Sequence, residues 1–406
     1  MASYETIRLV NLLVVRDFNE RGIAMYSKAL VLVAAAVLGG ATSARGVEWV
    51  VESVDPNALL QAGAGLALAS DGTPHIVYHH KVDSSWELRH AYKLGSTWLT
   101  ETIETSPRGG DRAVIEIDGQ DRLHIAYNFL NHGGSGGQVK YGLRDASGWT
   151  VQEVNPSSIH ARIPRIDLDA DGKPHLAFID NGGTLFASHY ATFDGSSWVI
   201  ETVGPTGLQS CLTCWDIALD SAGIPNIVGR ISSSLYLATR SGGVWSLEYV
   251  GRGGHEASIV LDQGDHHMIG HAVLNDDDLR FAAKEDGAWS NEVVLNLGPG
   301  AKGPSLALDA EGNPRMTFET DVDGSGHTLV QHAYLEGSDW IIDLVDSEMA
   351  VQSGTSLAVS DDGLSHVVYI ASGEVRYASA FIPEPATMLL LCGAAVPVLL
   401  KRRRKR

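Results

Sequence analysis

The chain has 406 residues and a formal net charge of −19 at pH 7. Residues 1–44 and 382–406 together carry ten basic and four acidic side chains, so residues 45–381 carry 20 basic and 45 acidic ones, a net charge of −25. Such an acidic surface repels nucleic-acid phosphates and anionic lipid, which excludes a nucleic-acid partner and favours cations or cationic partners.

A secretory signal peptide is predicted over residues 25–44. Lys28 supplies a positive start, Ala29–Leu38 forms an apolar run, and small residues follow, so cleavage is expected after Ala44. Residues 1–24 lie upstream of a normal signal and are expected to be a mis-called extension. An uncleaved membrane anchor is the alternative for this segment.

Seven tryptophans recur along the middle of the chain. Each opens a strand-like phrase, such as "WLTETI" or "WVIETV". A fixed period of this size is typical of propeller blades or solenoid turns. The spacings run from 44 to 51 residues, between Trp49, Trp98, Trp149, Trp198, Trp245, Trp289 and Trp340.

A second phrase also recurs seven times, for example "LALASDGTPHIVY" and "IDLDADGKPHLAF". Alternating apolar residues flank an Asp/Gly-rich centre, which is typical of a β-hairpin. A third strand such as "ELRHAY" follows, then a turn and the Trp strand. Four strands per repeat without a helical period predict an all-β fold, a β-propeller.

The ends of the repeat region predict how the ring closes. The seventh repeat, residues 354–381, has three strands but no Trp strand, whereas residues 47–54 are a Trp strand with no repeat before them. The N-terminal strand is expected to complete the last blade, which removes exposed sheet edges. We predict a single seven-bladed β-propeller over residues 45–381; an open β-solenoid is the alternative, and the split last repeat argues against it.

A membrane-inserted helix is predicted at the C-terminal end. Ala386–Leu400 is an apolar run of 15 residues, shorter than the roughly 20 that a spanning helix usually needs. The basic residues 401–406 that follow would stay in the cytoplasm, and their long side chains would reach the interface.

Pro383, Glu384 and Pro385, followed by this apolar stretch and the basic cluster, resemble the PEP-CTERM sorting signal over residues 382–406. The resemblance implies export in a Gram-negative bacterium and cleavage near the Pro-Glu-Pro segment by an exosortase-type transpeptidase. The helix would then hold the chain in the membrane only until processing. The resemblance also implies a final place at the cell surface or in an exopolysaccharide or biofilm matrix.

The propeller repeats loosely resemble the sialidase-like (BNR-type) repeats, without the strict Asp-box Ser-x-Asp-x-Gly-x-Thr-Trp.

Asp167–Gly172 begins like a calcium loop, but Phe178 stands where an EF-hand needs Glu. Asp169 and its counterparts are therefore expected to bond their own turns. No cofactor is expected, with calcium as the alternative. The counterparts are Asp118, Asp220, Asp262 and Asp309.

Two more residue types repeat. Histidines at one repeat position are expected to be bonded locally, because equivalent positions on separate blades lie too far apart to share an ion. They are His75, His124, His175, His267 and His366, with Asn226 and Arg315 in the other two blades. An acid three residues after each tryptophan is expected to be structural or part of a solvated outer edge. It is Glu52, Glu101, Glu201, Glu248, Glu292 or Asp343, with Gln152 as the exception.

Cys211 and Cys214 form "CLTC", which predicts a small local disulfide in an exported protein. Trp215 follows instead of His, which excludes c-type haem attachment, and no second cysteine pair completes a zinc site. A redox role is the alternative.

Candidate ligand-binding residues lie where the outer strand of one blade leads to the inner strand of the next. In propellers these loops and those between the second and third strands share one face around the channel. Arginine can hold a carboxylate with two hydrogen bonds and Trp215 could stack on a sugar, so we expect an acidic sugar there; a merely polar loop surface is the alternative. The candidates are Arg112, His160, Arg162, Arg165, Trp215, Asp216, His255 and Glu256, with Asp111 and Lys302 beside them. The second class of loops adds His79, His80, Trp86, Asn128, His132, Asp180, Arg230, His271, Asp276, Asp277, Asp278, Asp321, Asp323 and His327.

The one G-x-S-x-G match, Gly133–Gly137, has no helical pattern after it and so offers no nucleophile elbow, and the sequence contains no H-E-x-x-H motif. The main hypothesis is therefore an exported envelope or matrix protein, a non-catalytic propeller that binds polysaccharide or matrix protein. The alternative is a polysaccharide lyase or glycoside hydrolase acting on acidic polysaccharide. In that case Arg112, Arg165, His160 and His255 are the residues to test first. A third hypothesis is a rigid scaffold that binds only proteins.

Overall fold

The structure is a computed structural model. It describes residues 47–382 except for short gaps at 57–62, 107–111, 131–136, 157, 181–186, 205–212, 255, 274–277, 297–300, 322–327 and 347–353. Several predictions therefore lie outside the described residues: the signal peptide with Ala44, the tail with Pro383, Glu384 and Pro385, the disulfide of Cys211 and Cys214, His255, and the side chain of Asp321. Asp111, His132, Asp276, Asp277, Asp323 and His327 lie outside them too. Within the described ranges no helix is long and apolar enough to cross a membrane.

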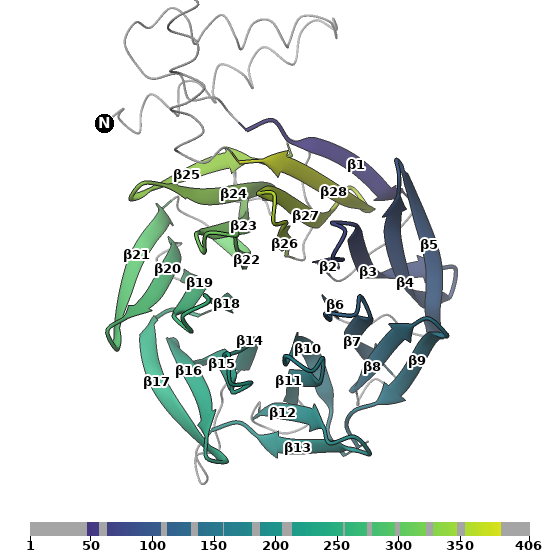
Figure 1. Cartoon of the computed structure of the whole chain (residues 1–406), viewed down its shortest axis with the longest axis horizontal. Helices are drawn as coiled ribbons and strands as arrows, with labels where there is room; N and C mark the ends of the chain where they lie inside the picture. Colours follow the sequence, from purple (N-terminus) through teal and green to yellow (C-terminus); the bar gives the residue numbers. More distant parts are fainter. Residues whose placement is uncertain are drawn as a thin grey trace, which may run out of the picture. The chain divides into compact units, whose positions relative to one another are not determined.

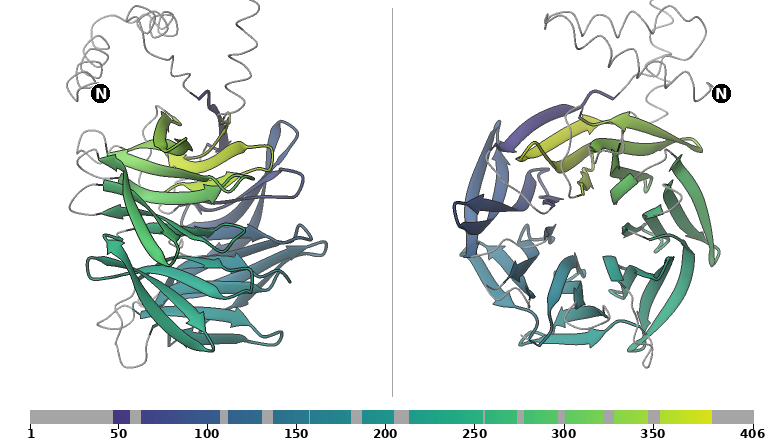
Figure 2. Two further views of the ribbon diagram at one scale, coloured as in Figure 1. Left: turned by 60° about the vertical axis from the view of Figure 1, so that its left-hand side comes forward. Right: turned by 180° about the vertical axis from the view of Figure 1, so that it is seen from behind.

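Seven four-stranded antiparallel sheets form the blades of a β-propeller, arranged as a ring (Figures 1 and 2). Blades 1 to 3 comprise β2 (Gly65–Leu68), β3 (Pro74–Val82), β4 (Ser85–Leu94) and β5 (Thr97–Ser106); β6 (Ala113–Ile117), β7 (Leu123–Leu130), β8 (Gly137–Asp145) and β9 (Gly148–Glu153); β10 (Ala161–Leu168), β11 (Pro174–Asp180), β12 (Ala187–Phe193) and β13 (Trp198–Thr202).

Blades 4 to 7 continue in the same order from the inner to the outer strand. They comprise β14 (Thr213–Leu219), β15 (Pro225–Ile231), β16 (Ser234–Ser241) and β17 (Val244–Arg252); β18 (Ala257–Leu261), β19 (His267–Val273), β20 (Asp278–Glu285) and β21 (Ala288–Asn296); β22 (Ala301–Leu308), β23 (Pro314–Asp321), β24 (Thr328–Glu336) and β25 (Asp339–Leu344); β26 (Ser356–Val359), β27 (Leu364–Ala371), β28 (Glu374–Phe381) and β1 (Val50–Asp55).

The ring closes through the N-terminal strand, as the sequence predicted. The last sheet has the order β1-β28-β27-β26, so the first strand of the chain is the outermost strand of blade 7. β1 runs antiparallel to β28, with Val50 opposite Ser379 and Glu52 opposite Tyr377. Figure 1 shows β1 in purple on the outside of the yellow β28. The split repeat therefore joins the two ends of the propeller, and the prediction of seven blades is confirmed.

The apolar core lies in the seams between blades. One buried cluster combines Ile76 and Tyr78 of blade 1 with Val368 and Tyr377 of blade 7. Because a second strand is covered on both faces by the neighbouring blades, it reads as a nearly continuous apolar run, and Leu176–Ile179 of β11 is fully buried. This distribution leaves the centre of the ring free of core packing.

In several seams the repeated acid of the Trp strand joins one blade to the next. Glu52 Oε2 accepts a hydrogen bond of 3.0 Å from Trp98 Nε1, and its Oε1 lies 2.6 Å from Lys93 Nζ. The same arrangement of acid, tryptophan and cation, here called the seam latch, joins Glu101 to Trp149 and Arg144, and Glu248 to Trp289 and Lys284. The structural interpretation of this acid is confirmed.

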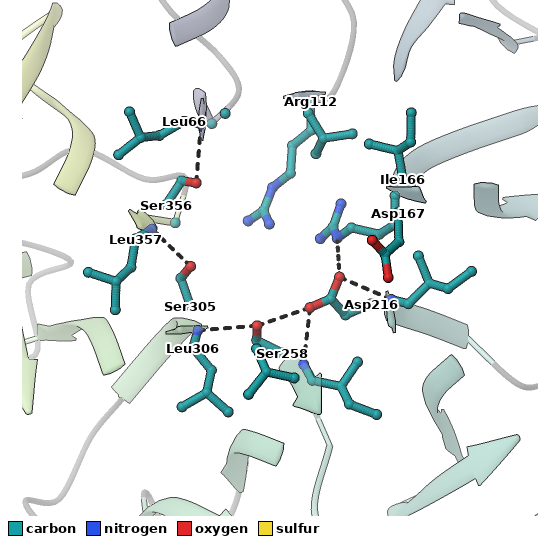
Figure 3. Close-up of a pocket in the computed structure, with 18 of the residues that line it drawn as sticks. Leu66, Arg112, Ile166, Asp167, Asp216, Ser258, Ser305, Leu306, Ser356 and Leu357 are labelled. Carbon is teal, nitrogen blue, oxygen red and sulfur yellow. Dashed lines mark hydrogen bonds and ion pairs between the residues drawn. The ribbon is translucent and has the colours of Figure 1, made fainter. Parts of the chain in front are cut away.

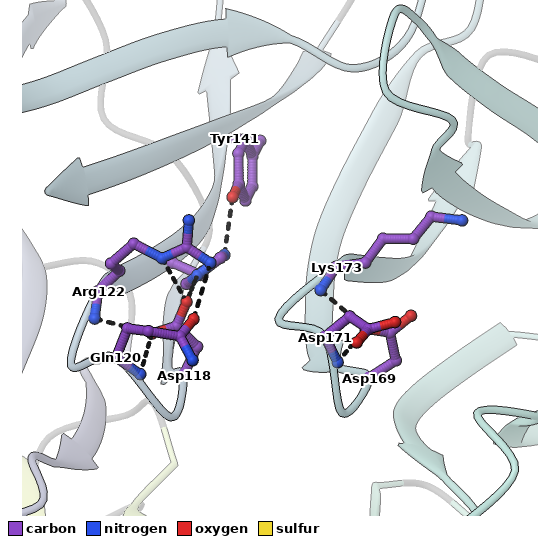
Figure 4. Close-up of polar contacts among 8 residues, drawn as sticks. Asp118, Gln120, Arg122, Tyr141, Asp169, Asp171 and Lys173 are labelled. Atoms are coloured by element: carbon purple, nitrogen blue, oxygen red, sulfur yellow. Dashed lines mark hydrogen bonds and ion pairs between the residues drawn. The ribbon is translucent and has the colours of Figure 1, made fainter.

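The repeated aspartates hold the hairpin turns, as predicted. Oδ1 of Asp169 accepts the backbone N–H groups of Asp171 at 3.0 Å and Lys173 at 2.9 Å, and Asp118 does the same for its own turn (Figure 4). Four of the repeated histidines are bonded within their own blade, as predicted, whereas His267 Nε2 lies 3.0 Å from Asn226 Oδ1 of the neighbouring blade. His175 Nδ1 lies 2.5 Å from the hydroxyl of Tyr190, and His366 Nδ1 lies 2.5 Å from that of Tyr377.

Candidate binding site in the central channel

A cavity of about 380 Å³ occupies the centre of the ring. It is lined by the innermost strands of all seven blades, so each blade contributes the same stretch of its repeat. Within a strand, alternate residues face the same way. The lining therefore contains rings of equivalent residues, and the residues between them, such as Ile166 and Leu306, are buried in the seams.

One ring of equivalent residues consists of Gly65, Val114, Arg165, Asp216, Ser258, Ser305 and Ser356. Two positions further along each strand, the equivalent residues are Ala67, Glu116, Asp167, Ala218, Val260, Ala307 and Ala358, of which Glu116, Asp167, Ala218 and Val260 line the cavity. Most members are small or apolar. The charged members lie on blades 2, 3 and 4, so one side of the channel differs from the rest.

On the other side of the channel, serine hydroxyl groups accept hydrogen bonds from the edges of the inner strands. Ser305 Oγ accepts a 3.0 Å hydrogen bond from the backbone N–H of Leu357, and Ser356 Oγ accepts one of 3.3 Å from Leu66 N–H. Ser258 Oγ accepts the N–H of Leu306 at 3.2 Å (Figure 3). The innermost strand of a blade has an unpaired edge, and these bonds satisfy its donors from the neighbouring blade.

The charged side of the channel centres on Arg165, Asp167 and Asp216. Asp216 Oδ2 accepts Ser258 Oγ at 2.9 Å and Ile259 N–H at 3.1 Å, and its Oδ1 lies 3.9 Å from Arg165 Nε. Asp167 accepts the backbone N–H groups of Leu219 at 2.6 Å and Leu168 at 2.7 Å. Asp167 thus bonds the backbone of blade 4 and Asp216 that of blade 5, and the charge of Asp216 acts on Asp167 (Figure 3).

The three channel carboxyl groups differ in how strongly they hold a proton. Burial raises the pKa of Asp167 to about 6, against the opposing hydrogen bonds from Leu219 and Leu168. Burial and the negative charges of Asp167 and Asp216 raise the pKa of Glu116 well above its usual range. Burial also raises the pKa of Asp216, opposed by the charge of Arg165. All three carboxyl groups thus hold a proton more tightly than an exposed carboxyl group does.

Arg112 and Glu256 lie at the end of the channel where the inner strands begin. A carboxylate oxygen of Glu256 accepts the backbone N–H of Gly303. The guanidinium of Arg112 reaches from blade 2 to blade 7, because a Cβ built on Gly354 would lie 2.6 Å from its Nη2. Gly354 also has φ of +84°, so both its backbone and its neighbour require glycine. Figure 3 shows the Arg112 side chain extending into the cavity.

The structure brings together four of the eight candidates: Arg112, Arg165, Asp216 and Glu256 all line the channel. Arg165 and Asp216 lie on inner strands, not in the expected loops, because bulges at the start of β10 and β14 lengthen those strands. His160 and Arg162 lie outside the channel lining, and the backbone N–H of His160 donates to Asp180. Trp215 lies on β14, and nothing further is described of its side chain.

The described residues from the loops between second and third strands also lie away from the channel lining. His80 Nδ1 lies 2.9 Å from Asp55 Oδ2, and the Asn128 amide donates to Ala161 O at 2.6 Å. His79 and His271 are buried. These side chains hold the blades together. Among the described residues, no group of three or more His, Cys, Asp and Glu side chains is placed to hold a metal ion.

Sequence reasoning missed Glu116 and Asp167 as channel residues. A signal was present: the other repeats have Ala or Val at this position, in "LAL", "IAL" and "IVL", whereas these two repeats read "IEI" and "IDL". A charge at a position that is otherwise small or apolar marks a departure from the repeat. Residues that differ from the repeat consensus on the inner strands therefore locate this site better than the loop residues that the sequence suggested.

Comparisons with known proteins identify the fold but no family. No protein-family model and no curated protein matches the chain. Among solved structures it is similar to a PL25 polysaccharide lyase, an ulvan lyase bound to -[GlcA(1-4)Rha3S]-, with 13% identity, a TM-score of 0.54, and coverage of 82% of this chain and 95% of that one. It is also similar to AofleA from Arthrobotrys oligospora, with 9% identity, a TM-score of 0.50, and coverage of 74% and 90%. At these identities the likeness is one of fold.

Proposed function

We propose that this protein is a polysaccharide lyase that acts on an acidic polysaccharide at its central channel. The observation that carries the proposal is the presence of Arg112, Arg165, Asp167 and Glu116 in one cavity. Guanidinium groups can hold the carboxylate of a uronate, and a base with a pKa near the working pH can take the adjacent proton. The fold likeness to a lyase supports this alternative over the non-catalytic hypothesis.

The roles follow from the order of the pKa values. When the surroundings give two neighbouring carboxyl groups different pKa values, the group with the higher pKa can act as the acid and the one with the lower pKa as the base. Asp167, with a pKa of about 6, is the base that takes the proton beside the uronate carboxylate. Glu116, whose pKa burial and two nearby charges raise well above its usual range, gives its proton to the leaving glycosidic oxygen. The bond to that oxygen breaks, and a carbon–carbon double bond forms in the sugar.

The second candidate function is binding without cleavage, which was the main hypothesis from the sequence. The described lining of the channel contains neither a histidine nor a tyrosine, and His160, an expected base, lies outside that lining. A channel that clamps a carboxylate between arginines without a competent base would be a polysaccharide-binding site. The two functions share the ligand and differ only in the product.

The test uses the full chain with oligosaccharides of galacturonate, glucuronate and sulfated uronate, and a neutral oligosaccharide as comparison. Binding and the ultraviolet absorbance of unsaturated sugar ends are recorded together. We expect unsaturated product from the wild type, and a loss of at least about 100-fold in rate for Asp167→Asn and Glu116→Gln. His160→Ala and Asp171→Asn, both outside the channel, should keep the activity.

Binding of uronate oligosaccharides without unsaturated product would establish the second candidate function. Absence of both binding and product would reject the channel as a polysaccharide site. Arg165→Met tests whether the channel is the binding site, because it should weaken binding of the acidic oligosaccharides under either function and leave the neutral one unaffected.

We also propose that the protein is exported and reaches the cell surface or extracellular matrix after processing by an exosortase-type transpeptidase. The predicted signal peptide at 25–44 and the PEP-CTERM resemblance of 382–406 support this. Changing Pro383 and Pro385 to Ala should leave the full-length chain in the membrane fraction, whereas the unchanged chain is released in shortened form. Equal release of both would contradict the proposal.

A further inference from the structure

The seam between blades 2 and 3 lacks the ionic part of the seam latch. In four blades the residue that pairs with the latch tryptophan across the sheet is a cation: Lys93, Arg144, Arg240 or Lys284. In blade 3 that residue is Phe193, opposite Trp198. The acid that it would meet is replaced by Gln152, whose Oε1 accepts Trp198 Nε1 at 3.3 Å. An amide and an aromatic ring thus replace an ion pair.

A cavity of about 420 Å³ lies at this seam. Phe193 and Gln152 line it, together with Tyr141, Arg122 and residues 171–173 of the neighbouring turn. It lies at the opposite end of the inner strands from Arg112, because Arg112 precedes β6 whereas the turn of Arg122 follows it. The seam cavity is therefore separate from the channel site.

A chain of hydrogen bonds fixes one wall of the seam cavity. Tyr141 Oη lies 2.7 Å from His124 Nδ1, and His124 Nε2 lies 3.1 Å from Asp118 Oδ2. The same oxygen accepts Arg122 Nε at 2.6 Å (Figure 4). Gly172 of the neighbouring turn packs against this wall, because a Cβ there would lie 3.0 Å from both Arg122 Nη2 and Asp118 Oδ2. The wall is preorganised, and binding there orders few additional side chains.

The charges and polar groups that line the seam cavity determine which class of ligand it can bind. Arg122 and Lys173 contribute two positive charges, and Asp171 and Asp194 contribute two negative ones, so the cavity favours neither an anion nor a cation. Phe193 offers a flat apolar surface, and Gln152 with the charged groups offers donors and acceptors. A sugar ring without charge has both an apolar C–H face and hydroxyl groups.

We propose that the seam between blades 2 and 3 binds a neutral sugar residue, with Phe193 against its apolar face and Gln152, Arg122 and Asp171 at its hydroxyl groups. This site does not depend on the channel or on any reaction there. Its volume of about 420 Å³ lies within the range of roughly 300–1,000 Å³ that is usual for ligand pockets.

The sharpest test restores the repeat. The double variant Gln152→Glu/Phe193→Lys recreates the acid and cation of the neighbouring seams and fills the cavity with an ion pair, so it should fold at least as stably as the wild type. The matched control is Leu335→Lys, which places a cation opposite Trp340 and beside Glu292 in the seam of blades 5 and 6. The control leaves the seam cavity of blades 2 and 3 unchanged.

The probes are the methyl glycosides of glucose, galactose and mannose, titrated against the full chain by saturation-transfer NMR, with melting temperatures measured for every variant. We expect saturable binding of at least one glycoside to the wild type, with a Kd on the order of 1 mM. The double variant should bind at least about tenfold more weakly, whereas Leu335→Lys should bind like the wild type. Phe193→Ala, which removes only the ring, provides a second loss-of-binding variant if the double variant melts early.

Arg165→Met separates this proposal from the channel site, because it should leave binding of the methyl glycosides unchanged. Wild-type affinity in both the double variant and Phe193→Ala would overturn the proposal. So would an absence of binding of all three methyl glycosides to the wild type.

Discussion

The indole Nε1 of Trp98 donates a 3.0 Å hydrogen bond to Oε2 of Glu52, and this bond connects the first blade of the ring to the last. Trp98 lies on β5 of blade 1, whereas Glu52 lies on β1, which completes blade 7. Lys93 Nζ lies 2.6 Å from the other carboxylate oxygen. The closing strand is thus held by its pairing with β28 on one side and by this latch on the other.

Loss of the closing latch should destabilise the whole propeller. We expect Glu52→Ala to lower the free energy of unfolding by about 1–2 kcal/mol, because removal of the half-buried carboxylate leaves both the Trp98 N–H and the Lys93 ammonium without this acceptor. Urea unfolding measures the change. Glu292→Ala is the matched control: Glu292 bonds Trp340 but has Leu335 in place of the cation, so its loss should be smaller. Equal losses in the two variants would contradict the latch.

Arg315 stands at the repeat position that is usually histidine, and it joins blades 6 and 7. It is 2% exposed, with Nη1 donating to Gly363 O at 2.7 Å and Nη2 to Asp309 Oδ2 at 3.2 Å. We expect Arg315→Met to cost about 3 kcal/mol of unfolding free energy, because it strips a buried carboxylate of its partner.

The control for this change is Arg315→His, which restores the repeat. His124 in blade 2 lies 3.1 Å from its own turn aspartate, Asp118, so a histidine at 315 should bond Asp309 in the same way. Chemical unfolding should place Arg315→His between the wild type and Arg315→Met. A histidine variant as unstable as the methionine variant would show that the repeat geometry is not transferable between these blades.

Asp167 should make the folded protein less stable as the pH rises through its range. Burial raises its folded pKa to about 6, above the value of an unfolded aspartate, so the folded state binds the proton more tightly. The stabilisation that Asp167 contributes is therefore fully present below about pH 4 and is lost as the pH rises to about 6. The difference in unfolding free energy between the wild type and Asp167→Asn should change by about 1–3 kcal/mol over this window, reduced by water in the channel.

The measurement for Asp167 is a series of urea titrations at intervals between pH 4 and pH 7. Asp171→Asn, an exposed neighbour in the turn, is the control and should parallel the wild type. A wild type and Asp167→Asn whose stabilities stay parallel across the range would rule out the raised pKa, and with it the role of Asp167 as a base.

His332 should give the opposite slope. It is fully buried, next to the edge of Trp49, and burial lowers its pKa to about 3. A depressed histidine pKa stabilises the fold above the unfolded pKa of about 6.5, and this stability is lost as the pH falls. We expect the wild type to lose about 2 kcal/mol relative to His332→Gln between pH 6.5 and pH 5. Unfolding titrations of both proteins measure this.

His266→Gln provides a control of opposite sign. His266 is exposed, and its hydrogen bond to Asp262 raises its pKa. The stabilisation that the His266–Asp262 bond gives the fold is present at low pH and decreases as the pH rises through the folded pKa of His266. If His332→Gln retained the acid sensitivity of the wild type, the buried neutral histidine would not be its source.

The sequence by itself determined the elements and their number. Trp98, Trp149 and the other tryptophans recur with a period that encodes four short strands, and strands are favoured by local alternation of apolar residues. The missing Trp strand of the last repeat and the extra one at 47–54 determined how the ring closes. The acids of the Trp strands were predicted as structural for the same reason: what repeats in every blade serves the fold.

Only the tertiary structure decided which residues of different blades meet. Glu116, Asp167 and Asp216 are about 50 residues apart in sequence, and they share the channel because equivalent positions on inner strands converge at the centre of the ring. Gln152 and Phe193 likewise meet only across a seam, where one blade packs on the next. The local sequence determines the strand to which a residue belongs. The contacts across the seams, and the burial that shifts the pKa of Asp167, arise only once all seven blades have closed.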